Sequence, residues 1–465
     1  MAYHKITADI LQQITAIVGS DAVITSHDDL EKYSHDETED LSYYPEVVVK
    51  PRSAKEISQL LTLCNQYLIP VTPRGAGTGL SGGALSVLGG LLISMERFNQ
   101  ILNIDERNLQ AIVEPGVITE VFMNAVAEKC LFYPVDPASK GSCFMGGNVA
   151  HGSGGPRVVK YGTIREYILN LEVVLPSGDI IWTGANTLKY ASGYNLTQLM
   201  IGSEGTLGIV TKIVTKLIPH PTTDVLMLAS FSTNESACAA VAEIFMAGVT
   251  PSAVEFMERK CIEWVMEYSG ILFNLKDEDN AFLLIEVDGT DKDVIFSECE
   301  KINRVLEKFG CKDVLFADTA AQKANLWQIR RIIGESVKIN SVYKKEDMVV
   351  PRAELPALIK GIKAIGKKYS FDSVCFGHAG DGNLHLNIVK GSMSDEAWAN
   401  ERDKGIREIF ELTVSLGGTI SGEHGIGLVQ KEFMPIKYTD VHFALWKGIK
   451  QVFDKNNILN PEKIF

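Results

Sequence analysis

The chain has 465 residues, 46% of them hydrophobic and 22% charged, which is the composition of a globular protein with room for two or three domains. The formal net charge of −13 argues against a nucleic acid as partner, because proteins that bind phosphate backbones concentrate Lys and Arg.

The N-terminal residues 1–19 follow an amphipathic helix pattern and do not have the form of a signal peptide. No apolar run approaches the roughly 18 residues that cross a bilayer. The eight cysteines are widely spaced, which excludes zinc ribbons and the usual iron–sulfur motifs. We therefore expect a cytoplasmic protein with free thiols and no transmembrane segment. Peripheral contact with a membrane is the alternative.

Glycine-rich loops alternate with β-branched strands from about residue 42 to residue 220. Between the first two strands a helix is expected to begin, because Ser53 and Glu56 have the spacing of a capping box. The predicted strands lie within residues 45–51, 69–75, 89–95, 111–116, 168–178 and 205–219.

The pattern changes after residue 220, where strands alternate with longer helices. This alternation of strands and helices indicates an α+β domain. Its predicted strands include residues 224–231 and 281–289, and its predicted helices include residues 235–248 and 297–310. The tail, residues 443–465, is predicted to be a helix followed by a turn.

The stretch FGHAGDGNLHLNI, residues 376–388, predicts a β-hairpin, because Gly and Asp accept the positive φ angles of a tight turn. Alternation of side chains puts His378 and His385 on one face. They lie diagonally if residues 380 and 381 are the turn centre, and directly opposite if residues 381 and 382 are. Each can be an ordinary core histidine. Two close imidazole rings repel each other when both are protonated, however, so the pair favours the neutral form, which is the form that ligates a metal.

Three glycine-rich loops predict a binding site for a large cofactor. The first contains Gly77, Gly79 and Gly82 in the spacing of a dinucleotide fingerprint. A Rossmann fold is not expected, because residues 82–90, GGALSVLGG, contain four glycines and leave no room for the crossover helix before the next strand. The loop amides can instead surround a pyrophosphate, although a run of tight turns is the alternative. The three loops are residues 73–90, 141–155 and 202–211.

Five motifs together resemble one known family. They are PRGAGTGLSGG, the segment Pro137 to Asn148, GYNLTQLMIGSEGTLGIVT, HAGDGNLHLN and GGTISGEHGIG. Over nearly the whole chain the sequence is similar to the FAD-dependent D-2-hydroxy-acid dehydrogenases. This branch of the vanillyl-alcohol oxidase superfamily includes D-lactate dehydrogenases, the glycolate oxidase flavin subunit and D-2-hydroxyglutarate dehydrogenase.

The resemblance implies an α+β fold. It consists of a PCMH-type FAD-binding domain of two α/β subdomains, an α+β substrate (cap) domain that also binds the metal, and a helical C-terminal segment that returns to the FAD domain. The expected limits are residues 1–220, 221–425 and 426–465.

The resemblance also implies which residues hold FAD. A pyrophosphate cradle, residues lining the flavin, residues on the adenosine side and a closing asparagine are expected. In that order they are Pro73, Arg74, Gly75, Ala76, Gly77, Thr78, Gly79, Ser81 and Gly82; Pro137, Ser142, Gly146, Gly147, Asn148, Gly152, Tyr161 and Gly162; Glu204, Gly205 and Ile209; and Asn460. The chain departs from the family at residues 150–153, where many relatives read ATNA.

The flavin is expected to be bound non-covalently, because the first glycine loop contains neither histidine nor cysteine. Some members of the superfamily tether the flavin through one of these side chains. If this chain did so, Cys143 and His151 would be the candidates.

A third metal ligand is predicted in GGTISGEHGIG, where Glu423 and His424 lie between glycines. Alone, this Glu-His pair can be a solvated turn. Together with His378 and His385, Glu423 completes a set of two histidines and one carboxylate, typical of a catalytic divalent cation, with zinc first and manganese or iron as alternatives.

Four residues are predicted to act on the substrate. Imidazole titrates near neutral pH, so His424 is the expected general base. The substrate carboxylate requires a fixed cation as its partner. The resemblance implies that Arg330 and Lys345 supply it. Asn387, on the face of the hairpin histidines, is expected to orient the substrate or a ligand.

The predicted reaction is FAD- and metal-dependent oxidation of a D-2-hydroxy acid, with D-lactate or glycolate first, to the 2-oxo acid. An alternative is the flavin subunit of a larger electron-transfer complex, and D-2-hydroxyglutarate dehydrogenase is another. Expected partners are the small acid and an electron acceptor such as a quinone or an electron-transferring flavoprotein. A homodimer or a heteromeric complex is compatible with the sequence.

Overall fold

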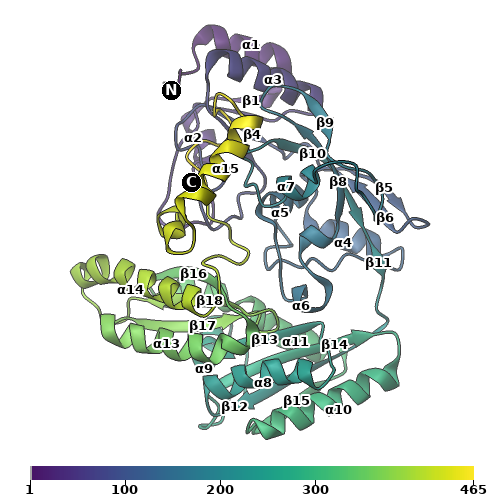
Figure 1. Cartoon of the computed structure of the whole chain (residues 1–465), viewed down its shortest axis with the longest axis vertical. Coiled ribbons are helices and arrows are strands. Elements are labelled where there is room, and N and C mark those ends of the chain that lie inside the picture. The colour runs from purple at the N-terminus through teal and green to yellow at the C-terminus, as the bar shows by residue number, and fades with distance from the viewer. Residues whose placement is uncertain (1–2) are drawn as a thin grey trace. The chain divides into compact units, whose positions relative to one another are not determined.

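The computed structural model describes residues 3–465 and divides the chain into two compact units. The first unit comprises the chain up to residue 154, residues 163–220 and residues 423–465. The second comprises residues 155–162 and 221–422. Both units combine helices with sheets, so the predicted α+β class is confirmed (Figure 1).

The first unit contains two larger sheets and a small one. The four-stranded sheet has the order β1-β2-β4-β3, the five-stranded sheet has the order β5-β6-β10-β8-β9, and β11 pairs with β7. The strands are β1 (Val23–Ile24), β2 (Val47–Val49), β3 (Val71–Arg74), β4 (Leu91–Ser94), β5 (Ile101–Asp105), β6 (Gln110–Val113), β7 (Leu131–Phe132), β8 (Ile168–Val174), β9 (Ile180–Trp182), β10 (Ile209–Lys216) and β11 (Ile218–Pro219).

The region around β3 and β4 confirms that no Rossmann crossover is present. The two strands are parallel neighbours, and the described chain between them contains no helix. The glycine-rich residues 75–90 make the connection as loop and turns.

Helices surround these sheets, and two of them confirm sequence predictions. The Ser53 hydroxyl accepts the Glu56 N–H at 3.2 Å at the start of α3, as a capping residue should. The predicted N-terminal helix is α1, whereas residues 1 and 2 lie outside the described part. The helices are α1 (Ala8–Val18), α2 (His27–Leu30), α3 (Ala54–Tyr67), α4 (Thr119–Ala127), α5 (Met145–His151), α7 (Leu196–Met200) and α15 (Asp440–Phe453).

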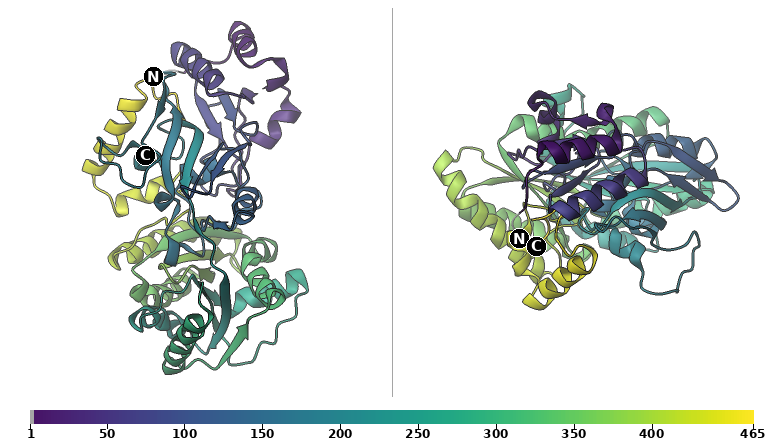
Figure 2. Two further views of the ribbon diagram at one scale, coloured as in Figure 1. Left: turned by 90° about the vertical axis from the view of Figure 1, so that its right-hand side faces the viewer. Right: turned by 90° about the horizontal axis from the view of Figure 1, so that it is seen from above.

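The first and last described segments of the chain meet. The Tyr3 hydroxyl donates to the carbonyl of Asn457 at 2.7 Å, and the two ends lie near each other in both views of Figure 2. The end of the chain also adds to the four-stranded sheet, because Leu459 bridges Val71 in parallel.

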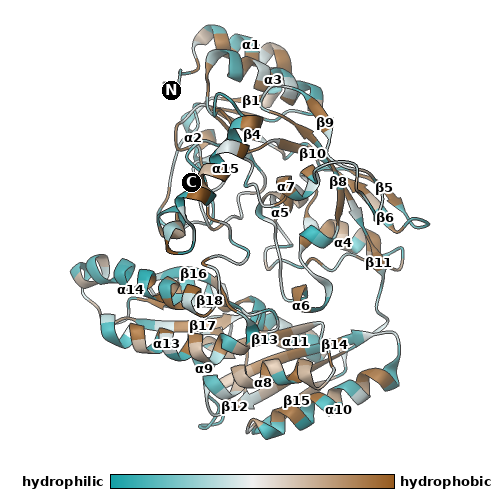
Figure 3. Cartoon of the chain, viewed as in Figure 1, coloured by the Kyte–Doolittle hydropathy of each residue, from teal (hydrophilic) through white to brown (hydrophobic). Residues whose placement is uncertain are grey.

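The second unit is built on one antiparallel seven-stranded sheet of the order β15-β12-β14-β13-β17-β18-β16. Most of the strands are largely hydrophobic, with the charged β16 as an exception, whereas the helices that cover the sheet show both polar and apolar residues (Figure 3). The strands are β12 (Thr223–Phe231), β13 (Ala253–Glu258), β14 (Ala281–Gly289), β15 (Asp313–Ala317), β16 (Tyr343–Val349), β17 (Asp372–Gly377) and β18 (Asn383–Val389).

Helices α9, α11 and α12 share one hydrophobic core with the sheet, whereas α8, α10 and α13 form another set of contacts with it. Among the described residues, no helix is long and apolar enough to cross a membrane. The helices are α6 (Val158–Tyr161), α8 (Asn234–Met246), α9 (Arg259–Ser269), α10 (Lys292–Lys308), α11 (Ala320–Arg331), α12 (Ile333–Asn340), α13 (Leu355–Tyr369) and α14 (Asp395–Ser415).

The short segment 155–162 is counted with the second unit, although the sequence places it inside the first predicted domain. Partly buried ion pairs hold it there. Arg157 contacts Glu286 at 3.0 Å, and Lys160 contacts Asp288 at 2.6 Å. The chain therefore enters the second unit briefly before it returns there at Pro221.

Candidate active site and cofactor pocket

One face of the seven-stranded sheet carries a row of polar side chains among apolar ones. The predicted hairpin is present as β17 and β18, and Phe376 pairs with His385. This register corresponds to residues 380 and 381 as the turn centre, so His378 is diagonal to His385. The two ring centroids are 5.1 Å apart, and each residue is 6% exposed.

A fully buried carboxylate, Glu255, holds the first histidine. The register of β13 with β17 continues from Phe256 opposite Gly377 to Glu255 opposite His378. The carboxylate lies 2.7 Å from His378 Nδ1 and 2.6 Å from the Arg330 guanidinium. Burial by itself would raise the pKa of Glu255, but the nearby charges of Arg330 and His378 keep it below its usual value.

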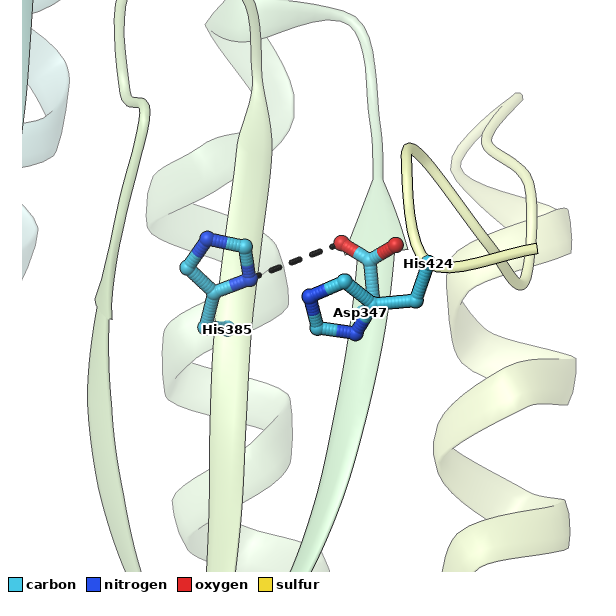
Figure 4. A group of neighbouring side chains, drawn as sticks. All are labelled: Asp347, His385 and His424. Carbon is cyan, nitrogen blue, oxygen red and sulfur yellow. Dashed lines mark ion pairs between the residues drawn. The ribbon is translucent and has the colours of Figure 1, made fainter. Parts of the chain in front are cut away.

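A second buried carboxylate, Asp347, accompanies the second histidine. Asp347 lies opposite His385 in the pairing of β16 with β18. Its carboxylate is 3.5 Å from His385 Nδ1, the ion pair drawn in Figure 4. The Asn383 amide also donates to it at 2.7 Å. A carboxylate on Nδ1 favours the tautomer that presents Nε2 to a metal.

Glu423 and His424 are tied to this region by the chain itself. The Gly422 N–H donates to the Asp347 carboxylate at 2.9 Å, within the second unit. Glu423 is the next residue, and because consecutive Cα atoms are about 3.8 Å apart, the anchored Gly422 restricts where Glu423 can lie. Glu423 and His424 are counted with the first unit. Two residue sets have the composition to hold a cation, His378 and His385 with Glu423, and Asp347 and His385 with His424.

The three other predicted substrate residues also lie in the second unit. Arg330, at the end of α11, is buried and forms an ion pair with Glu255 at 2.6 Å, while its Nε has no acceptor among residues 3–465. Asn387 is fully buried, and its amide donates to the Val374 carbonyl at 3.3 Å. Lys345 is half-buried and lies opposite Asn387 across β16 and β18.

The first unit contains a pocket formed by the glycine-rich loops. It has about 740 Å³ of empty space, open solvent included. Of the residues predicted to bind the cofactor, eight line this pocket. They are Pro73, Arg74, Gly75, Gly146, Gly147, Glu204, Gly205 and Ile209.

Several predicted cofactor residues, one of them in the pocket lining, form hydrogen bonds that support the loops. The Arg74 guanidinium donates to the carbonyl of His35 at 2.8 Å. The Gly82 N–H donates to the Thr38 hydroxyl at 2.7 Å, and the Asn148 amide donates to the Thr119 hydroxyl at 2.6 Å. The pocket lining does not include Ala76, Gly77, Thr78, Gly79, Ser81, Gly82, Pro137, Ser142, Asn148, Gly152 or Asn460.

Two predicted cofactor residues, Tyr161 and Gly162, belong to the segment counted with the second unit. The Tyr161 hydroxyl donates to the Asp288 carboxylate at 2.7 Å. Burial and this neighbouring charge raise the pKa of Tyr161 far above its ordinary value.

Sequence reasoning missed Glu255 and Asp347. Each is at most 2% exposed. Glu255 lies in a mostly apolar strand, AVEFME, whereas Asp347 lies in the charged strand YKKEDMV, where nothing in the sequence distinguishes it from its neighbours. Acidic residues are almost never fully buried unless they are paired. A charge inside an apolar strand was therefore the available signal for Glu255, but it does not identify the partner.

Comparison with known families shows to which family the chain belongs. The family described as "FAD linked oxidases, C-terminal domain" matches residues 220–464, and the "FAD binding domain" family matches residues 45–184. The chain belongs to the family of FAD-linked oxidases. This FAD-linked oxidase is therefore an oxidoreductase, and its cofactor is FAD.

Relatives of nearly equal length support the assignment. The FAD-linked oxidase is 39% identical to glycolate oxidase subunit GlcD of Bacillus subtilis (strain 168), with 99% of this chain and 97% of the relative covered. It is 36% identical to a D-lactate dehydrogenase of Anaerostipes hadrus (99% and 98% covered) and 31% identical to a D-2-hydroxyglutarate dehydrogenase of Stutzerimonas stutzeri (98% and 98%). These names support FAD-linked oxidation of hydroxy acids.

Solved structures confirm the PCMH-type fold. p-Cresol methylhydroxylase superimposes with a TM-score of 0.80 at 19% identity, covering 98% of this chain and 96% of the other. The 4-ethylphenol oxidase of Gulosibacter chungangensis gives a TM-score of 0.78 at 19% identity, covering 100% and 98%.

The residues of the pocket fit FAD. A Cβ on Gly205 would lie 2.7 Å from Pro73, and one on Gly146 would lie 2.5 Å from Pro115, so glycine is required for the close packing of the pocket wall at both positions. His151 also lines the pocket, and its buried Nδ1 has no partner among the described residues. A polar cofactor edge would satisfy such an atom.

Proposed function

We propose that this FAD-linked oxidase converts a D-2-hydroxy acid such as D-lactate, or glycolate, to the 2-oxo acid with the help of a divalent cation. The names of the relatives support the substrate class. Bound FAD would accept the hydride that leaves the substrate carbon. The cation, with Zn²⁺ first, would lower the pKa of the substrate hydroxyl.

One observation carries the metal proposal. Two adjacent buried histidines each have Nδ1 next to a buried carboxylate, Glu255 for His378 and Asp347 for His385. Carboxylate–histidine pairs of this kind orient metal ligands and raise their basicity. His378 and His385 would therefore ligate through Nε2, and Glu423, one residue after the anchored Gly422, would supply the third ligand.

The remaining residues would hold the acid and remove its proton. Arg330 and Lys345 would bind the substrate carboxylate as fixed cations, and the Nε donor of Arg330 supports this role because it has no acceptor in the described chain. His424 would take the hydroxyl proton on a ring nitrogen. Asn387 would hold the hairpin strands that carry the ligands, because its amide bonds β18 to β17.

A role as flavin subunit in a larger complex is the second candidate, because the relative in Bacillus subtilis is named a subunit of glycolate oxidase. The described cysteines are free thiols, so electrons would pass to a quinone, an electron-transferring flavoprotein or another subunit. Subunits that copurify with the natively expressed protein would support this role.

A substrate panel tests the proposal. The purified protein is mixed anaerobically with glycolate, D-lactate, L-lactate or D-2-hydroxyglutarate, and bleaching of the flavin is followed. We expect bleaching by a D-acid or glycolate and much slower bleaching by L-lactate. The activity should disappear with a chelator and return with Zn²⁺ or Mn²⁺. Bleaching by none of these acids would contradict the proposed function.

A further inference from the structure

The C-terminal residues 458–465 hold the loop that borders the cofactor pocket. The Asn460 amide donates to the carbonyls of Gly83 and Glu204 at 2.9 and 2.8 Å. The Lys463 ammonium donates to the carbonyl of Leu85 at 2.6 Å. Gly83 and Glu204 line the pocket. The tail therefore binds the loop carbonyls on both sides of Ala84, another residue of the pocket lining.

Two buried carboxylates lie at the same loop. Asp36 is 9% exposed, and its Oδ2 has no hydrogen-bond partner in the described chain and lies 3.9 Å from where a Cβ on Gly79 would be. Glu204 is 6% exposed and accepts the N–H groups of Ile426 and Gly427, both at 2.8 Å. These negative charges would oppose the diphosphate of FAD unless a cation offsets them.

Two buried cations interact with these carboxylates. Arg74, 7% exposed, interacts electrostatically with Asp36, whereas Lys463 interacts with both Asp36 and Glu204. Lys463 is only 3% exposed. Lys431 and Glu462 also act on it, with opposite signs, and these two charged groups lie 3.8 Å apart.

We propose that Lys463 is a positioning residue for the cofactor. Its ammonium group fixes the loop at Leu85 and offsets the charges of Asp36 and Glu204, so that the pocket accepts the FAD diphosphate. This role concerns binding of the cofactor only, so its test does not depend on which hydroxy acid is oxidised.

The proposal has a pH signature. Burial lowers the pKa of Lys463 to about 8 in the protein without FAD, despite the opposing effect of Asp36 and Glu204. The charge is therefore present below pH 8 and lost as the pH rises through that value. A nearby diphosphate would raise the pKa, so FAD binding would take up a proton above pH 8. The affinity for FAD should then fall by up to about tenfold per pH unit.

The test compares three variants with the wild type. Lys463→Met removes the charge, Lys463→Arg keeps it at every pH, and Lys455→Met changes an exposed lysine shortly before the tail as a control. The dissociation constant of FAD is measured by diluting each purified holoenzyme and following flavin fluorescence from about pH 7 to about pH 9. Thermal unfolding of each variant is recorded in parallel.

We expect Lys463→Met to weaken FAD binding by about tenfold or more at pH 7 and to lack the alkaline decline seen in the wild type. Lys463→Arg should bind FAD with little pH dependence, and Lys455→Met should match the wild type. Wild-type affinity in Lys463→Met, or the same alkaline decline in that variant, would overturn the proposal. If Lys463→Met does not fold, an alkaline decline that persists in Lys463→Arg would overturn it equally.

Discussion

His378 and His385 are the residues on which the metal proposal depends. We expect either histidine replaced by Ala to reduce the metal content and turnover strongly while FAD stays bound, because the glycine loops that are proposed to hold FAD belong to the other unit. The measurements are elemental analysis and flavin absorbance of each purified variant. His4→Ala, an exposed site, is the control. Full activity in a metal-free double variant would show that both histidines are only structural.

Glu255 should act on the metal through His378. Loss of a carboxylate that orients a ligand histidine costs about 10- to 100-fold in metal affinity. We therefore expect Glu255→Gln to bind Zn²⁺ about 10- to 100-fold more weakly, as measured by competition with a fluorescent chelator. The unfolding temperature should also fall, since Arg330 would lose its charged partner. Unchanged metal affinity in a folded Glu255→Gln protein would rule out the orienting role.

His424 is expected to act on the proton and not on the cofactor. The His424→Ala variant should keep both metal and FAD, but its flavin should be reduced roughly 10²- to 10⁴-fold more slowly, the usual contribution of general acid–base catalysis. Stopped-flow reduction by the best acid of the substrate panel provides the measurement. Loss of the metal together with the activity would instead indicate that His424 is a ligand.

At the scale of elements, the turn between β17 and β18 depends on Gly382. Its φ is +87°, and an added Cβ would lie 1.9 Å from the carbonyl oxygen of Val350. Gly382→Ala should therefore destabilise the protein by about 2 kcal/mol or more and lower its metal content. Gly334→Ala is the matched control, because no atom lies within 4 Å of its Cβ position in α12.

Denaturant unfolding of the two glycine variants measures the difference. Gly334→Ala should be neutral or stabilising by up to about 1 kcal/mol, since Ala favours a helix more than Gly. Equal stability of the two variants would mean that the turn at Gly382 can relax, and that the hairpin does not depend on it.

For the whole molecule, we expect non-covalent FAD. Acid precipitation of the yellow protein should leave the flavin in the supernatant, because the glycine loop of residues 73–84 offers no tethering side chain. Absorbance of the supernatant and the pellet checks this result. Flavin in the pellet would point to His151, which lines the pocket, and the His151→Ala variant would then be expected to release it.

The sequence determined the features that depend on local pattern. Alternation along β17 and β18 placed the histidines on one face, the Ser53 cap began α3, and the lack of room for a helix before β4 excluded a Rossmann crossover. These results follow from periodicity, capping and chain length, which involve neighbours within a few residues.

Only the tertiary structure decided which distant groups meet. Glu255 is 123 positions from His378, and they meet because β13 pairs with β17. Likewise, Arg157 is 129 positions from Glu286, and Lys463 is 378 positions from Leu85. Period-two alternation shows which side chains share a face, but it does not show which strand lies alongside. That choice depends on burying the apolar surfaces of the whole unit at once, so the partners of the buried charges become known only with the fold.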